Sequence, residues 1–578
     1  MTSELVLWAL WAALDPIAGL QAAEHAPARA RSLPRYELDV RLDLTAMQLE
    51  GQARIELPAP RPAGPVVLRL YPNAWIKHGP PSLRVVSARA SGAPVRVEVA
   101  SRTNVRLHVA ASARVIDVRW SGSLPKVPRQ DALSLETLLG ALGGGSDDDG
   151  LGYGLYGVTG HSVALAGFYP ALADVRQGRW DDAEPAPIGD SGPNHLCDVR
   201  LRLELRRGRG VAVTPGVDVS PQAPSGPASV IVRQAASVRD FPLFVLHEYV
   251  ALEAELAGVR VRSWVRPEHR AEGGRALGFA KSALYALERR FGPYPYVGLE
   301  VVELPLRGGA GGAEFPGLIV VADTLYAPPD LGPLGALLGD AGGASAAPEL
   351  GAMMRELLEF TIAHEVAHQW WAMLVGSDAR RAPFVDEPLT SWSAALAIGD
   401  ARGDAVGRAA LERNARAGYQ MARLLGTSDG PVRRPVTGFA SKNAYGALVY
   451  GKAPMLFSHL EKRMGREPLL RALRGYADAH RFGEASPGAL FEALASGAPD
   501  PAAARAIIRR FLDERRGDAD LGKASVAELV QRFLPGMDLG PMAPMLEQLM
   551  GAGGGLELEA LPGLEPRPRR DPSSPRSR

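Results

Sequence analysis

The chain is short of several residue classes, and each shortage limits what it can be. It has one cysteine, Cys197, so no disulfide can form within the chain and cysteine usage leaves the redox compartment open. We expect this thiol to be a small buried group in a strand. Charge of one sign is also lacking, because 65 Lys and Arg residues against 64 Asp and Glu residues leave a net charge of +1. Such a balance predicts no surface for nucleic acid or for an acidic polymer.

Long apolar runs are scarce as well. One run near the N-terminus, Leu5 to Leu14, has ten residues, which is too short to span a bilayer. It is similar to the core of a signal peptide, although Glu4 stands where a basic residue is usual and no Lys or Arg precedes it. We therefore take residues 1–30 as a signal-like or disordered segment. We favour export, to the periplasm or the cell exterior, over a cytoplasmic location, and we expect no transmembrane helix.

Histidine is scarce too, which makes one string of residues conspicuous. Among 578 residues there are 11 histidines, and two of them stand four positions apart in His364-Glu365-Val366-Ala367-His368. The segment from Ala352 through Val375 contains no Gly or Pro and predicts a helix that ends at Gly376. On a helix, positions i and i+4 share a face, so both imidazoles can bind one tetrahedral metal ion. Glu365 can then lie beside the metal and accept a proton from water.

The chain offers a third metal ligand at a suitable distance. Glu387 lies nineteen positions after His368, far enough for a second helix to present it and to leave the fourth coordination position for water. The alternative is a pair of core histidines with an ion-paired glutamate. In either case these groups need a partner in a buried helix, because an unpaired buried carboxylate costs several kcal/mol.

Two further segments carry polar groups suited to a peptidase. Gly311-Gly312-Ala313-Glu314-Phe315 lies between two apolar runs that predict strands, Leu299 to Leu304 and Leu318 to Ala322, and an acidic residue there can bind an ammonium group. Downstream, Tyr445 and Tyr450 flank a short apolar run, and a phenol near the metal can donate a hydrogen bond to an oxyanion. The alternatives are a glutamate in a glycine-rich turn and an ordinary half-buried tyrosine.

These residues together resemble the aminopeptidase N family of gluzincin zinc metallopeptidases. In that family eighteen residues separate the histidine motif from the third glutamate ligand, and here the interval is 387 − 368 − 1 = 18. The similarity runs from about residue 35 to about residue 515. Its motifs lie in His364-Glu365-Val366-Ala367-His368-Gln369-Trp370, Asp386-Glu387-Pro388, Gly311 to Phe315, Phe291-Gly292-Pro293-Tyr294-Pro295-Tyr296 and Tyr450-Gly451-Lys452-Ala453.

The resemblance implies roles for particular residues. His364, His368 and Glu387 would hold one Zn²⁺, with Glu365 as general base and Tyr450 as the oxyanion donor. The remaining implied contacts are to the substrate: Glu314 would receive its free α-ammonium group, and the other substrate-binding positions are Gly311, Gly312 and Tyr445. Four residues depart from the family pattern, namely Ala313, Phe315, Ala372 and Pro388. None of them is a ligand, the base or the tyrosine, so they bear on substrate preference and rate.

Patterning predicts a multidomain chain. Alternating apolar residues after Pro34 and again from Val199 to Leu205 predict a β-rich N-terminal domain over residues 31–252, an antiparallel β-sheet domain by resemblance. Residues 253–517 fit the α+β thermolysin-like zinc-peptidase domain that the resemblance implies. We expect surface loops at residues 143–154 and 326–348, a short helical segment with a Met-rich stretch over 518–550, and a disordered tail over 551–578.

The function expected from the sequence is hydrolysis of the N-terminal peptide bond of peptides that have a free N-terminus. Two alternatives stay open. A zinc endopeptidase would keep the metal centre without using Glu314 to hold an amine. A catalytically silent peptide-binding protein would keep only the fold. The sequence does not indicate the preferred N-terminal residue or the oligomeric state.

Overall fold

The computed structural model describes residues 20–21, 33–128 and 152–533, apart from gaps at 187, 190–191, 208, 221–228 and 328–331. The apolar run Leu5 to Leu14, the Met-rich stretch and the tail over 551–578 lie outside the described residues. Within those described ranges, no helix combines the length and the apolar character needed to cross a bilayer.

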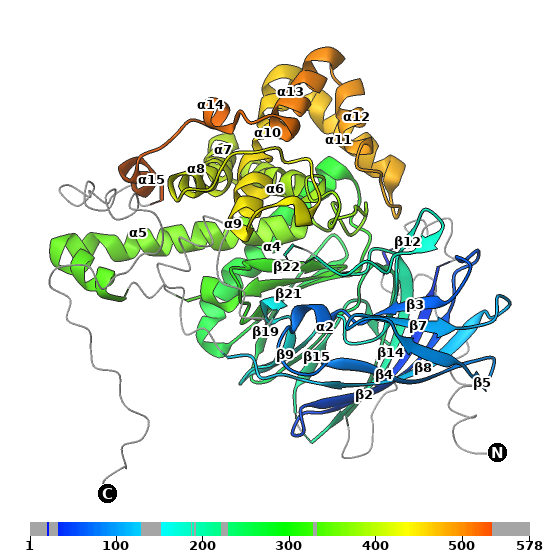
Figure 1. Cartoon of the computed structure of the whole chain (residues 1–578). Coiled ribbons are helices and arrows are strands. Elements are labelled where there is room, and N and C mark those ends of the chain that lie inside the picture. Colours follow the sequence, from blue (N-terminus) through cyan, green and yellow to red (C-terminus); the bar gives the residue numbers. More distant parts are fainter. Residues whose placement is uncertain are drawn as a thin grey trace, which may run out of the picture.

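An eight-stranded sheet forms the largest part of the N-terminal domain (Figure 1). Its strand order is β16-β17-β14-β1-β2-β8-β4-β5, and every neighbouring pair is antiparallel except β1 with β14. The strands are β1 (Arg35–Asp43), β2 (Gln48–Glu56), β4 (Leu83–Ala90), β5 (Ala93–Pro94), β8 (Val115–Ser123), β14 (Cys197–Arg206), β16 (Val217–Asp218) and β17 (Ser229–Val238). The alternation in the sequence is the cause of this sheet, because Tyr36, Leu38, Val40 and Leu42 of β1 all turn to the buried side.

Smaller sheets complete this domain. One has the order β15 (Val211–Val213), β18 (Leu243–Leu246), β10 (Ser162–Leu165) and β9 (Tyr156–Val158). Another has the order β11 (Ala171–Leu172), β3 (Val66–Arg69), β7 (Asn104–His108) and β6 (Arg96–Val99), and β12 (Val175–Arg176) pairs with β13 (Arg179–Trp180). Short helical turns lie at α2 (Pro72–Trp75) and η3 (Gly152–Gly154). As expected, Cys197 is buried in a strand.

A five-stranded mixed sheet begins the catalytic domain, in the order β19 (Val250–Leu256), β20 (Val259–Val265), β21 (Gly298–Leu304), β23 (Leu318–Ala322) and β22 (Gly312–Phe315). Both strands expected on either side of Glu314 are therefore present. Helix α4 (Arg270–Phe291) packs against β19 and β20, while α5 (Gly332–Ala367) packs against β22 and β23. The sheet starts at Val250, slightly before the domain boundary expected at residue 253.

Helices cover the other side of α5, as Figure 1 shows in yellow and orange. They are α6 (Asp386–Arg402), α7 (Asp404–Leu411), α8 (Ala417–Leu424), α9 (Lys442–Tyr445), α10 (Met455–Met464), α11 (Arg466–His480), α12 (Ala489–Ser496), α13 (Pro501–Asp513), α14 (Gly517–Leu521) and α15 (Val526–Phe533). Two π-helical segments, η6 (Glu412–Arg416) and η8 (Gly446–Lys452), interrupt this array, and 3₁₀ turns occur at η4 (Pro267–His269), η5 (Asp323–Leu325) and η7 (Val436–Gly438).

Three local expectations differ from the structure. The metal helix ends at Ala367 and not at Gly376, and turns follow it. Residues 332–348 were expected to form a loop, but they are the first turns of α5, because Ala and Leu in this stretch support a helix despite its glycines. The expected loop at 143–154 is described only from Gly152, and Gly154 there is buried, not at the surface.

Candidate metal centre and substrate cleft

Three buried side chains from two helices meet at one point. His364 and His368 lie one turn apart at the end of α5, and their Nε2 atoms are 3.2 Å apart. Glu387, in the first turn of α6, places Oε2 3.3 Å from His364 Nε2 and 3.5 Å from His368 Nε2. The i, i+4 spacing and the interval to Glu387 therefore bring together the donors expected from the sequence.

Hydrogen bonds orient both imidazoles toward this point. His368 Nδ1 lies 2.9 Å from the carbonyl oxygen of Trp371, a group that can only accept, so this nitrogen carries a proton and Nε2 is the atom that faces the centre. Thr390 Oγ1 lies 3.3 Å from the same Nδ1, and Ser391 Oγ lies 3.4 Å from His364 Nδ1. Thr390 and Ser391 were not predicted from the sequence, although their positions three and four residues after Glu387 place them on the same helix face.

The donor set fits a zinc ion. Two imidazole nitrogens and a carboxylate oxygen are the ligand types of catalytic zinc sites, and the three ligand atoms all lie within 4.8 Å of one another. Glu387 Oε2 is buried, and no hydrogen bond of good geometry reaches it. Although burial opposes ionisation, the neighbouring His368 and His364 hold the pKa of Glu387 well below its usual range, so the carboxylate is charged. A buried carboxylate that faces two imidazole nitrogens is a suitable site for a cation.

Glu365 lies next to this centre because a glycine makes room for it. A Cβ atom on Gly312 would lie 2.4 Å from Glu365 Oε1 and 2.6 Å from its Cδ and Cγ atoms. The strand β22 thus closes over the Glu365 side chain, which is 5% exposed. Burial raises the pKa of Glu365 well above its usual range.

Glu314 faces the same centre from β22. One carboxylate oxygen each from Glu314 and Glu365 and one nitrogen of His368 lie within 4.8 Å of one another. Gln369 fixes the position of this strand, because its amide accepts from Gly317 N at 2.9 Å and donates to Phe315 O at 3.0 Å. The residue after the histidine motif therefore connects the metal helix to the strand that carries Glu314.

The π-helical turn η8 brings the two tyrosines together. In an α-helix, residues five apart point in different directions, whereas the wider π turn brings them closer to the same face. The rings of Tyr445 and Tyr450 are accordingly 5.7 Å apart, and the Tyr450 ring lies 6.1 Å from that of His364. Both tyrosines line the cleft, as expected, whereas the π turn between them was not expected from the sequence.

Lys452 anchors the end of this π turn. Its side chain is 0% exposed, and its ammonium group donates to Asp429 Oδ1 at 3.0 Å, to Gly430 O at 3.0 Å and to Glu514 O at 2.7 Å. This satisfies all three N–H bonds of a buried cation. The lysine that follows Tyr450 by two residues therefore fixes the segment on which the tyrosine is held.

A cleft of about 350 Å³ contains these groups. Its walls come from both domains: the metal helix, β22 and η8 on one side, and Tyr153, Leu155 and Ile188 of the N-terminal domain on the other. Gly311, Gly312 and Glu314 all line it. The cleft thus brings together every site residue expected from the sequence.

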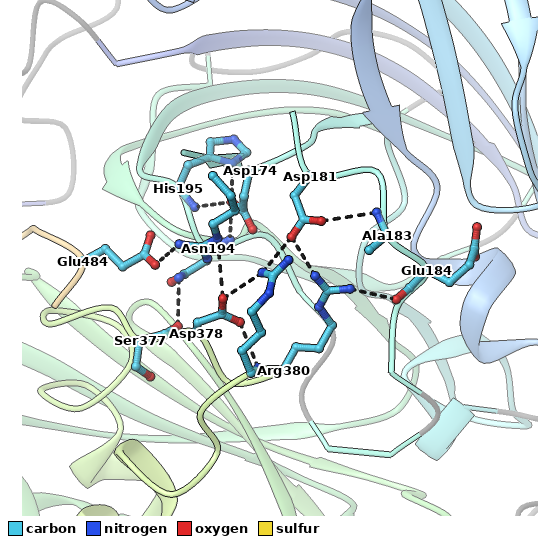
Figure 2. A network of polar contacts seen from close by, with 12 residues as sticks. Asp174, Asp181, Ala183, Glu184, Asn194, His195, Ser377, Asp378, Arg380 and Glu484 are labelled. Atoms are coloured by element: carbon cyan, nitrogen blue, oxygen red, sulfur yellow. Dashed lines mark hydrogen bonds and ion pairs between the residues drawn. The ribbon is translucent and has the colours of Figure 1, made fainter. Parts of the chain in front are cut away.

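A second cavity of about 160 Å³ lies between the two domains and shares Leu155, Ala313 and Glu314 with the cleft. Figure 2 shows the polar network along its wall, where Arg380 donates to Asp181 at 2.8 Å and to Glu184 O at 3.1 Å. Asn194 donates to Ser377 O at 2.8 Å across the same interface. These bonds join the domains around the cavity.

The four departures from the family pattern occupy defined places. Ala372 has φ of 103°, a left-handed conformation that favours glycine. Pro388 lies in the first turn of α6, where its missing N–H leaves no helical hydrogen bond unmade. Phe315 packs edge-on against Phe244 of the N-terminal domain, with ring centroids 6.0 Å apart. Ala313 lies between the cleft and the second cavity.

Comparison with known proteins agrees with this geometry. Residues 345–514 match the Peptidase family M1 domain. Aminopeptidase M1-A of Oryza sativa subsp. japonica is 24% identical over 246 residues, which are 42% of this chain and 26% of that protein. The chain therefore matches only about a quarter of the length of this curated relative.

Solved structures extend the likeness to both domains. A two-domain M1 zinc metallopeptidase variant bound to L-arginine has a TM-score of 0.56 at 16% identity, covering 84% of this chain and 94% of its own. The M1 zinc metallopeptidase from Deinococcus radiodurans gives 0.54 at 16% identity with the same coverage. These structures share the fold of this chain, an N-terminal sheet domain followed by a second, largely helical domain.

The fold and the donor set thus define a zinc metallopeptidase-like protein of two domains. Residues 345–514, which carry all three ligands, are similar to the Peptidase family M1 domain. The family and the buried ligands imply Zn²⁺ at His364, His368 and Glu387.

Proposed function

We propose that the protein is a zinc-dependent aminopeptidase that hydrolyses the first peptide bond of peptides with a free N-terminus. The observation that carries the proposal is the closeness of Glu314 to Glu365 and His368, with ligand atoms within 4.8 Å of one another. A substrate α-ammonium group bound by Glu314 would place the adjacent peptide bond at the base and the metal centre. Such an anchor restricts cleavage to the chain end.

The chain's residues divide the chemistry among them. Zn²⁺ held by His364, His368 and Glu387 would polarise the scissile carbonyl and acidify a water molecule. Glu365 accepts the proton of the attacking water and returns it to the leaving amine nitrogen. The Tyr450 hydroxyl donates a hydrogen bond to the carbonyl oxygen as negative charge develops there. Glu314 accepts hydrogen bonds from the α-ammonium group and fixes the register of the substrate.

Glu365→Gln tests the base directly. The variant keeps the ligands and the volume of the side chain but cannot accept the proton, so it should retain zinc by metal analysis and lose release of arylamine from aminoacyl arylamides. A chelator should abolish the same activity in the unaltered protein. Full activity of Glu365→Gln with zinc bound would refute the mechanism.

The two other readings give different results with the same preparations. A zinc endopeptidase would cleave N-acetylated peptides, whereas an enzyme that needs Glu314 to hold an ammonium group leaves them intact. A catalytically silent peptide-binding protein would cleave neither series. Glu314→Gln separates the readings further, because it should raise KM for free-amine substrates only if this carboxylate holds the amine.

A further inference from the structure

The second cavity contains a carboxylate that the proposed chemistry does not use. Asp240 is 9% exposed and lines this cavity together with Gly192, whose added Cβ would lie 3.7 Å from Asp240 Oδ2. Asp240 Oδ1 accepts a hydrogen bond from the N–H of Phe241 at 2.7 Å. Among the described residues, no Lys, Arg or His nitrogen forms an ion pair with Asp240, so one buried carboxylate lacks a cation.

Other charged groups of this cavity have partners, except Glu314, which faces the metal centre and for which no ion pair occurs among the described residues. Asp181 pairs with Arg380 and Arg381, and Asp174 with His195. Within the part of the chain that the structure describes, the guanidinium of Arg239 has no carboxylate partner and donates to the carbonyl oxygens of Met373, Asn194 and Gly483. Arg69 donates to Asn104 Oδ1 and to Ala183 O. Six carboxyl groups and four guanidinium groups line the cavity.

The position of the cavity relates it to the substrate. Ala313 and Glu314 border both the cleft and the second cavity, and the methyl group of Ala313 is small. If Glu314 holds the α-ammonium group, the side chain of the first substrate residue branches from the neighbouring carbon atom, where the two cavities meet. A long side chain can then extend from the cleft into the second cavity.

We propose that this cavity receives the side chain of the first substrate residue and that Asp240 selects a basic one, lysine or arginine. This inference rests on the proposed aminopeptidase function. Burial raises the pKa of Asp240 to about 7, as expected for a carboxylate whose cationic partner arrives with the ligand. A cationic side chain would supply the ion pair that Asp240 lacks, whereas an apolar side chain of equal length would leave the carboxylate buried and unpaired.

Lysine and norleucine make a matched pair for the test, because they differ mainly in the terminal ammonium group. Binding of lysinamide and norleucinamide is measured by calorimetry with the zinc-loaded full chain, and kcat/KM with the two aminoacyl arylamides. We expect lysine to be preferred at least about tenfold in both, since a hydrogen bond to a charged group contributes that much. Asp240→Asn should remove most of this preference.

A control keeps the change in net charge but avoids the cavity. Asp182→Asn removes an exposed carboxylate that pairs with Arg106, so the lysine preference should stay as in the unaltered protein. Equal treatment of lysine and norleucine by the unaltered protein, or an undiminished preference in Asp240→Asn, would overturn the inference while arylamide hydrolysis still upheld the proposed function. Failure to cleave any aminoacyl arylamide would instead overturn the proposed function. The calorimetric comparison of lysinamide with norleucinamide would still show whether Asp240 selects a basic side chain.

Discussion

Replacing Gly312 with alanine tests whether the position of Glu365 controls the reaction. The added Cβ would lie 2.4 Å from Glu365 Oε1 and 2.6 Å from Cδ. Carbon atoms in contact prefer a separation of about 3.5 Å, so the carboxylate has to move by about 1 Å. Gly312 lies in strand β22 and not in the left-handed region, so alanine fits its backbone.

Gly312→Ala should therefore lower the rate of the reaction without lowering the stability of the fold. A catalytic group displaced by about 1 Å can lose on the order of a hundredfold in rate. A Gly→Ala change at a compatible backbone position stabilises by about 0.4–1 kcal/mol through the unfolded state, which offsets the cost of moving one side chain. We expect kcat to fall about a hundredfold while the melting temperature and the zinc content stay close to those of the unaltered protein.

Gly311→Ala is the matched control. Its Cβ would meet only Thr361, with Cγ2 at 3.6 Å and Oγ1 at 3.7 Å, which is ordinary contact. Initial rates on a leucyl arylamide, zinc analysis and thermal unfolding compare both variants with the unaltered chain. If Gly312→Ala keeps its full kcat, the carboxylate position inferred from this contact does not govern the reaction.

Further predictions concern the tyrosine, its anchor, a strained residue and a buried histidine. Tyr450→Phe should lower kcat about a hundredfold with little change in KM, because it removes a donor used only in the transition state; an equal rise in KM would contradict this. Lys452→Met leaves Asp429 buried without a cation and should cost about 3–5 kcal/mol in urea unfolding, whereas Arg463→Met, which breaks an exposed pair with Asp500, should cost about 0–1 kcal/mol. Ala372→Gly should stabilise by about 0.5–1 kcal/mol, because relief of the left-handed strain exceeds the entropy cost of glycine; a lower melting temperature would refute that balance. Glu303 accepts a hydrogen bond from His269 Nδ1 at 2.8 Å and raises the pKa of this histidine. The protonated histidine therefore stabilises the fold fully below the unfolded pKa of about 6.5, and this contribution is lost as pH rises through the folded pKa. The difference in unfolding free energy between the unaltered protein and His269→Gln should shrink with rising pH.

Features with a local period could be predicted from the sequence. The alternation of Tyr36, Leu38, Val40 and Leu42 fixed which face of β1 is buried, because side chains alternate along any strand. The i, i+4 spacing predicted that both histidines lie on one face of α5, because residues four apart lie one above the other on a helix. Glu387 was predictable through the interval of the resembling family, since spacing alone does not tell where a second helix turns back.

Features that arise only when distant segments meet were not predictable. The π turn at Gly446–Lys452 depends on the burial of Lys452 against Asp429 and on packing of Gly451 against Tyr419, whose Cβ would lie 3.0 Å from an added Cβ. Asp240 follows a buried arginine in an unremarkable apolar stretch of sequence. Its place beside the cleft exists only because the N-terminal domain docks against the catalytic domain.

Three of the four departures from the family pattern lie at the same place in the structure. Ala313, Phe315 and Ala372 all line the second cavity, where we place the first side chain of the substrate. By contrast, the metal ligands, Glu365 and Tyr450 match the pattern and line the cleft. Changes at the walls of one cavity alter which side chain fits, and they leave the base, the ligands and the tyrosine in place. Substrate choice can therefore differ from that of relatives without any change in how the peptide bond is broken.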